Sequence, residues 1–279
     1  MSNPVFDQLD HGRWGQSAVQ TQARPSYDQQ PYAPQMAQAE QMFHAPSADA
    51  IDRGRMTMDD VMMKTLASFA VLVLAGAVGW WATAINPATG TGLMVIGLIA
   101  AFILAMVNSL SKTVRPALIL AYAVAEGLAL GTLSMVMDSI YPGIVVQAVI
   151  GTAAVFGVTL ALFASHKVRN SSTLMRFTLI ALIGIVVWRV LDMILSMTGL
   201  LGQGLSGLTI AGIPLGVAVG FLAVLLGAAC LIQDFDAAQK GVVAGAPKVC
   251  AWQCAFGLMV TVVWMYVEIL RLLSYFRQN

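Results

Sequence analysis

The chain beyond Thr57 consists of long apolar stretches separated by short polar connections. Each stretch approaches the ~20 residues that an α-helix needs to cross a hydrocarbon core of ~30 Å. Pro and Gly mark the connections, as in Asn86-Pro87, Arg115-Pro116 and Tyr141-Pro142-Gly143. We therefore predict seven membrane-spanning helices. Their expected ranges are 62–85, 91–108, 116–137, 144–164, 177–197, 211–233 and 252–273.

Composition supports this fold class. Hydrophobic residues make up 58% of the chain and charged residues 10%, and the mean hydropathy is +0.77. Soluble domains carry about 25% charged residues. The sequence therefore predicts an all-α polytopic membrane protein, and a net charge of +1 gives no reason to expect a nucleic-acid partner.

Residues 1–56 differ from the rest because they are rich in Gln, Pro and Ala and lack apolar periodicity. We expect a disordered cytoplasmic tail there, ahead of a transmembrane domain at 57–279. Tyr27 and Tyr32 leave open a docking or phosphorylation site in this tail. The first residues lack the basic leader and apolar core of a signal peptide.

The positions of Lys and Arg predict the orientation. Twelve of the 15 basic residues lie in the tail, at the start of the first span (Lys64), or in the loops after the second, fourth and sixth spans. The alternate loops, 86–90, 138–143 and 198–210, contain none. We expect a cytoplasmic amino terminus and an outside carboxyl terminus. The long tail and the lack of a retention signal favour a bacterial plasma membrane.

Two acids in the last two spans, Asp234 and Glu268, are the main candidates for function. At about 100° per residue, Gly220, Gly227 and Asp234 fall close to one line along their helix, which continues a face of small residues that includes Gly212 and Gly216. Gly257, Thr261 and Glu268 form a comparable stripe on the last helix. Both acids should therefore face protein. Charged groups at this depth cost several kcal/mol unless they are paired or hydrated, so they mark functional pathways.

Close together in a low-dielectric cavity, the two acids would share a proton, and when both were ionised they would attract a divalent cation. Calcium suits such a site because it takes hard oxygen ligands in irregular geometry. We therefore predict proton sensing and tentative calcium binding at Asp234 and Glu268.

Four further charged residues are candidates. Glu126 lies near the middle of the third span and needs a partner. Arg189 and Asp192, three residues apart in the fifth span, are expected either to pair with each other or to reach the outer surface. Their pairing would either fix the rotation of the helix or serve transport. Asp236 lies on the opposite side of its helix from Asp234 and should face headgroups or water.

Three stretches resemble the Bax inhibitor-1-like family, which includes bacterial YccA-type proteins and eukaryotic transmembrane BAX inhibitor motif proteins. They are RPALILAYAVAEGLALGTLS, LIQDFDAAQKG and VVWMYVEILRLLSYF, and the resemblance covers about residues 57–279. It implies a ring of six helices around a central seventh, and a pH-sensitive calcium leak through a pair of acids that match Asp234 and Glu268. It also implies an Arg before the third helix that latches the first acid, matching Arg115.

The chain departs from the family pattern in two ways. The acid of the last span is Glu instead of Asp, and 34 residues separate it from Asp234. The two acids can meet only if the last membrane helix starts near Leu258, or if the preceding helix continues beyond Asp234. A second hypothesis is a non-transporting regulator that binds a membrane protease or another membrane complex, with the tail supplying the contact.

Other classes fit poorly. We expect no enzyme and no cofactor, because His11 and His44 lie in the tail and His166 in a loop, away from any intramembrane nucleophile. No GxxxxGK[ST] phosphate-binding motif occurs, and the last span has no lysine for a retinal Schiff base. The expected partners are the bilayer, calcium and protons. The remaining candidates are the three Cys residues, which should be buried, inert thiols: Cys230, Cys250 and Cys254.

Overall fold

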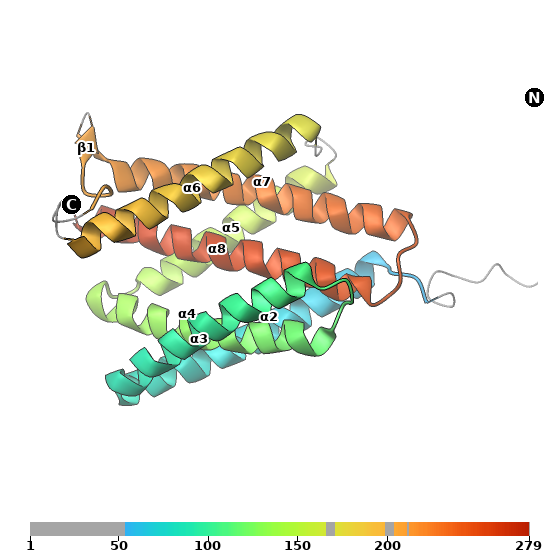
Figure 1. Cartoon of the computed structure of the whole chain (residues 1–279), viewed down its shortest axis with the longest axis horizontal. Helices are drawn as coiled ribbons and strands as arrows, with labels where there is room; N and C mark the ends of the chain where they lie inside the picture. The colour runs from blue at the N-terminus through green and yellow to red at the C-terminus, as the bar shows by residue number, and fades with distance from the viewer. Residues whose placement is uncertain (1–53, 166–170, 199–203, 211, 279) are drawn as a thin grey trace, which may run out of the picture. The chain divides into compact units, whose positions relative to one another are not determined.

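The computed structural model describes residues 54–165, 171–198, 204–210 and 212–278. Within these ranges the chain forms seven long helices and one pair of very short strands (Figure 1). The helices are α2 (Met58–Ile85), α3 (Pro87–Leu110), α4 (Pro116–Ile140), α5 (Ile144–Ala164), α6 (Ser172–Thr198), α7 (Leu215–Val243) and α8 (Cys250–Gln278). The strands β1 (Thr209–Ile210) and β2 (Ile213–Pro214) pair antiparallel just before α7.

All seven helices are long and apolar enough to cross a membrane, so the predicted spans and the all-α polytopic class are confirmed. The largest difference from the predicted ranges lies in α7, which continues to Val243 instead of ending at 233. It also starts later than predicted. Gly212 has a left-handed φ of 82° and lies in the turn between β1 and β2, so its predicted place in the helical glycine repeat is wrong.

The helix ends follow their local sequence. Thr57 caps α2 through a reciprocal capping box with Asp60. Pro87 and Pro116 occupy first positions of helices, where the missing N–H has no intrahelical partner to lose. Gly143 adopts a φ of 81° before α5, which a glycine allows at little cost. The predicted turns at Pro87, Pro116 and Gly143 are therefore confirmed.

Helices α2 and α4 touch backbone to backbone. A Cβ added to Gly131 of α4 would overlap the carbonyl oxygen of Gly76 in α2, and one on Gly127 would overlap that of Leu72. Buried hydroxyls add a hydrogen bond, since Thr83 donates to Thr132 across the same contact at 3.1 Å. Small residues permit this approach between membrane helices, where van der Waals packing replaces the hydrophobic effect.

Helix α8 packs against α2, α4, α5 and α7, and its side chains join two of the hydrophobic clusters. In Figure 1 it runs between α7 and the group formed by α2, α3 and α4. The α7 contact uses the predicted small face, because Gly216 lies against Tyr275, Gly220 against Leu272, and Gly227 against Met265. An arrangement of six helices as a ring around α8 stays a prediction.

The segment before α2 is fixed to the loop between α7 and α8. Arg55 forms a β-bridge with Pro247, the Met56 N–H donates to the Ala246 carbonyl at 2.8 Å, and the Met56 side chain is 1% exposed. Residues 54–56, which the predicted tail included, therefore contact the loop between α7 and α8. The predicted disorder of residues 1–53 lies outside the described residues.

Candidate functional site

Glu268 of α8 is buried and lies between two arginines. Arg189 of α6 donates a hydrogen bond from Nη2 to its Oε2, and Arg271 lies with Nη1 3.7 Å from Oε1. The carboxylate is 4% exposed and the Arg189 side chain 17%, whereas Arg271 is 39% exposed. A buried acid thus has a cationic partner inside the apolar bundle, and the site carries one more positive than negative charge.

Asp234 of α7 has a neutral partner. The Thr261 hydroxyl of α8 donates to its Oδ2 at 2.6 Å, and Gly257 of α8 faces Oδ1, since a Cβ there would lie 3.6 Å from it, in ordinary van der Waals contact. The carboxylate is therefore turned toward α8, and so it faces protein, as the helical spacing predicted. Nine more residues of α7 follow Asp234, so the acid lies within the helix and not near its end.

The structure gives each acid its own partner on a shared stripe of α8. Thr261, which holds Asp234, and Glu268 are seven residues apart, which corresponds to about 10 Å along the helix and nearly the same face. Helix α7 continues beyond Asp234, one of the two conditions that the sequence set for a meeting of the acids. The predicted proton sharing between them stays a prediction.

Arg189 and Asp192 bind other groups in place of the predicted mutual pair. Arg189 reaches Glu268, and Asp192 accepts hydrogen bonds from the Ser206 N–H at 2.9 Å and the Ser206 hydroxyl at 2.6 Å. Successive turns of α6 therefore serve two purposes. Arg189 joins α6 to α8, and Asp192 anchors the connection that leads to α7.

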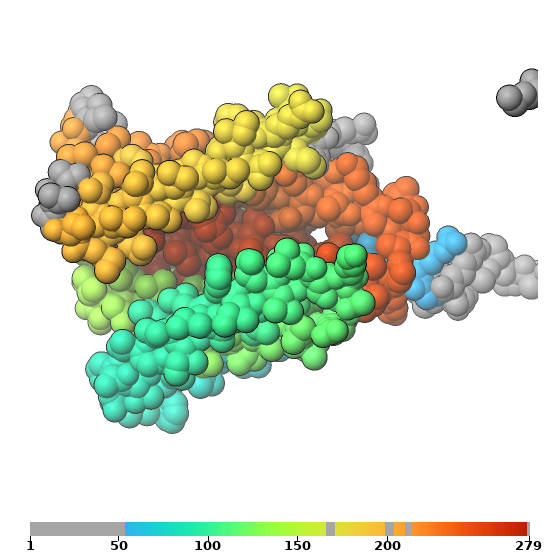
Figure 2. Space-filling view, in the orientation of Figure 1, coloured from blue at the N-terminus to red at the C-terminus, as the bar shows by residue number. Residues whose placement is uncertain are grey.

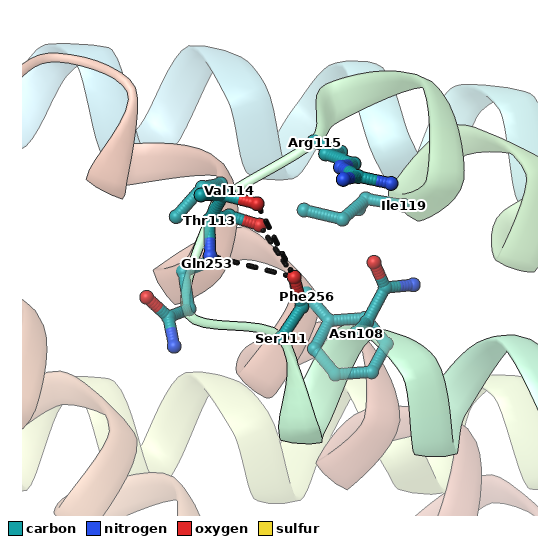
Figure 3. A pocket seen from close by; sticks show the side chains of 8 residues that line it. All are labelled: Asn108, Ser111, Thr113, Val114, Arg115, Ile119, Gln253 and Phe256. Carbon is teal, nitrogen blue, oxygen red and sulfur yellow. Dashed lines mark hydrogen bonds between the residues drawn. The ribbon is translucent and has the colours of Figure 1, made fainter.

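Arg115 caps α4 at one end of the bundle and is exposed. Figure 3 shows it beside a small pocket formed by the α3–α4 connection and by Gln253 and Phe256 of α8. The resemblance implied that Arg115 latches Asp234. The arginine that holds an acid of α8 is instead Arg189, and Asp234 accepts a hydrogen bond from Thr261.

Glu126 and Asp236 complete the predicted set. Glu126 is half-buried in α4, beside Gly127, which contacts α2. Asp236 pairs with Lys240 of its own helix at 2.6 Å, and Lys240 is 70% exposed. The Asp236 side chain is 18% exposed, so its predicted orientation toward headgroups or water stays a prediction.

Among the described residues, no group of three or more His, Cys, Asp or Glu is arranged to hold a metal. The three cysteines are free, as expected, but they are partly buried instead of fully buried. Any calcium bound here would therefore need carbonyl or water oxygens besides the acids. Carboxylate and hydroxyl oxygens are present at Asp234 and Thr261.

Sequence reasoning missed the partners of both acids. Thr261 was placed on the right stripe, but its hydroxyl was not assigned to Asp234. The signal for Arg189 was present, because an intramembrane arginine requires an acid. The choice among Asp192, Glu126 and Glu268 depended on helix rotation, which a single sequence leaves open. The role of Ser206 had no signal in the pattern.

The fold and the site define a polytopic membrane protein with charged groups paired between its helices. The sequence pattern of the family described as Bax inhibitor 1 like matches residues 3–278, and the chain belongs to this family. The match also covers the tail, whereas the three resembling stretches indicated similarity over about residues 57–279 only. No curated protein matches the chain significantly.

Proposed function

We propose that the protein is a pH-sensitive cation leak or proton-coupled cation transporter, with calcium as the ion. The observation that carries the proposal is the buried Glu268, held by Arg189 from another helix. Removing one partner of a buried ion pair costs about 3–5 kcal/mol. A pair retained at this depth is a better candidate for a gate than for a packing device.

At this site a cation and the arginines compete for the same carboxylate oxygen atoms. A cation on the α8 stripe would meet the Asp234 carboxylate and the Thr261 hydroxyl, and about 10 Å further the Glu268 carboxylate. Arg189 and Arg271 already neutralise Glu268 and repel a cation. Passage therefore requires Glu268 to exchange Arg189 for the ion. Figure 2 shows a hollow between α3 and α6 with α8 visible at its floor.

The expected pH dependence follows from charge. Protonation of Asp234 removes the negative charge that attracts the ion, and protonation of Glu268 leaves two arginines uncompensated beside the path. Both changes oppose cation entry. Flux should therefore rise with pH.

The test is calcium flux into vesicles that contain the purified protein, followed with a trapped indicator across a pH series. Asp234→Asn and Glu268→Gln should each lower the flux by about tenfold or more, because each removes a buried charge. Asp236→Asn is the matched control, since Asp236 lies in the same helix but pairs with Lys240. Unchanged flux in both test variants would exclude the mechanism.

The second candidate is a non-transporting regulator that binds a membrane protease or another membrane complex. The range of the family match supports this candidate, because the matched residues begin at residue 3 and so include the tail. On this hypothesis the acids set helix packing, and the tail supplies the contact. Deletion of residues 2–50 separates the two, since a conduction path would survive it and a tail-dependent interaction would be lost.

A further inference from the structure

A long apolar groove lies on the bundle between α2 and α5, with α4, α7 and α8 forming its floor. Its volume is about 1040 Å³, at the upper end of the range of about 300–1,000 Å³ that is typical of ligand sites. On α2 it extends from Met58 to Trp80, which corresponds to ~33 Å of helix. The α2 wall of the groove is therefore about as long as the ~30 Å hydrocarbon core is thick.

The walls of the groove are open to the bilayer. Leu66 and Val73 of α2 and Val149 of α5 line it and are each more than half exposed. Deeper in, Phe156 of α5 packs edge to face on Phe235 of α7, and both line the groove. An apolar ligand that enters from the side would thus lie between two helices and rest on aromatic rings.

The Met58 end of the groove carries an excess of one positive charge, because Arg55, Lys64 and Lys248 outnumber Asp59 and Asp60 there. Lys64 and Lys248 both approach the same Asp60 oxygen, at 3.8 and 3.2 Å, so one carboxylate serves two ammonium groups. Lys248 is 52% exposed. Arg55, also exposed, lies on the same segment through its bridge to Pro247. An anionic group at this end would find cations at the height where lipid headgroups begin.

We infer that the groove binds one anionic phospholipid, with an acyl chain along α2 and α5 and the phosphate beside Lys248. A chain from this leaflet reaches about half of the ~30 Å core, far enough to cover Leu66, Phe156 and Phe235. Phe235 is the neighbour of Asp234 in α7. The bound chain therefore stabilises the rotation of α7 that turns Asp234 toward Thr261.

The experiment uses the full-length protein in mild detergent and native mass spectrometry with added phosphatidylglycerol or phosphatidylcholine. Ala153→Phe fills the groove, and Ala154→Phe is the control, because both alanines are exposed on α5 and only Ala153 lines the groove. Wild type and the control should retain one phosphatidylglycerol, and Ala153→Phe should lose about tenfold in retention. Equal retention by the two variants would overturn the proposal.

A second pair keeps the test decisive if Ala153→Phe fails to fold. Leu160 and Leu162 of α5 are both 40% exposed, and Leu160 alone of the two lines the groove. Leu160→Trp should therefore lower retention relative to Leu162→Trp. If instead a dimer dissociates in Leu160→Trp while lipid retention is unchanged, a second copy occupies the groove and the lipid proposal is wrong.

The headgroup is tested separately. Lys248→Gln should reduce retention of phosphatidylglycerol to the level of phosphatidylcholine, whereas Lys112→Gln, an exposed lysine on another connection, should leave it unchanged. Retention of both lipids to the same extent by wild type would contradict the proposed charge recognition. These experiments measure lipid retention and not calcium flux. Their outcome is therefore independent of the test of the proposed function.

Discussion

Arg189 of α6 and Glu268 of α8, 79 residues apart in the chain, form a buried ion pair. The buried residues of α6 in the described chain are Thr178 and Ile185, and Ile185 clusters with Ala223 and Leu226 of α7. The ion pair adds an attachment of α6 to α8. Two further nitrogens of Arg189, Nε and Nη1, are buried without a hydrogen-bond partner among the described residues. The arginine is held by one strong interaction and has donors to spare.

Arg189→Gln should increase calcium flux, because glutamine removes the cation that competes for Glu268 while it keeps hydrogen-bond donors. The rise should be about tenfold at neutral pH. Arg176→Gln is the control, since Arg176 is an exposed residue of the same helix. A fall in flux, or the same rise in both variants, would count against a latch at Arg189.

Thr261→Val should reduce flux and thermal stability together. Valine keeps the shape of threonine but removes the donor to Asp234, and an unsatisfied buried acceptor costs about 1–3 kcal/mol. Thr159→Val is the matched control, because the Thr159 hydroxyl donates to the Val155 carbonyl of its own helix. Wild-type flux in Thr261→Val would show that Asp234 does not depend on this hydrogen bond.

Gly131→Ala should destabilise the bundle by about 1–3 kcal/mol, since the new methyl group meets the Gly76 carbonyl oxygen and overpacking has costs of this size. Gly157→Ala introduces the same methyl into open space in α5, where alanine is the better helix former. Thermal unfolding in detergent measures both. Equal melting temperatures would show that α2 and α4 lie further apart than described.

Two truncations test the contact of the α2 amino-terminal segment with the α7–α8 loop. Deletion of residues 2–50 leaves the segment Gly54–Met56 in place, so the melting temperature and the calcium flux should remain near wild type. Deletion of residues 2–56 also removes the buried Met56 and its hydrogen bond to Ala246, and should lower the melting temperature. The prediction fails if both truncations melt alike.

Cysteine labelling tests the orientation. In a background with the three native cysteines replaced by alanine, Ser139→Cys should react with an impermeant maleimide on intact cells. Lys112→Cys should react only after permeabilisation, because it lies on a connection of the opposite side. Both positions are exposed. The reverse pattern would place the amino terminus outside.

The sequence predicted the fold through its strongest signals, which are apolar length and the Pro and Gly that interrupt it. It also placed Asp234 and Glu268 on protein-facing sides of their helices. Helical periodicity alone decides which residues lie on the same face as Gly220 and Gly257. The partners were beyond its reach. Arg189 had three acids to choose from, and the choice depends on how α6 is rotated and raised against α8, which results from packing between distant segments.

The backbone contact at Gly76 and Gly131 leaves almost no freedom between α2 and α4, so these two helices shift only as a unit. Helix α6 has the opposite character, with a largely lipid-facing surface and one charged attachment to α8. Any opening of the bundle should therefore begin with a displacement of α6. The paired glycines then act as the immobile frame against which that displacement is made.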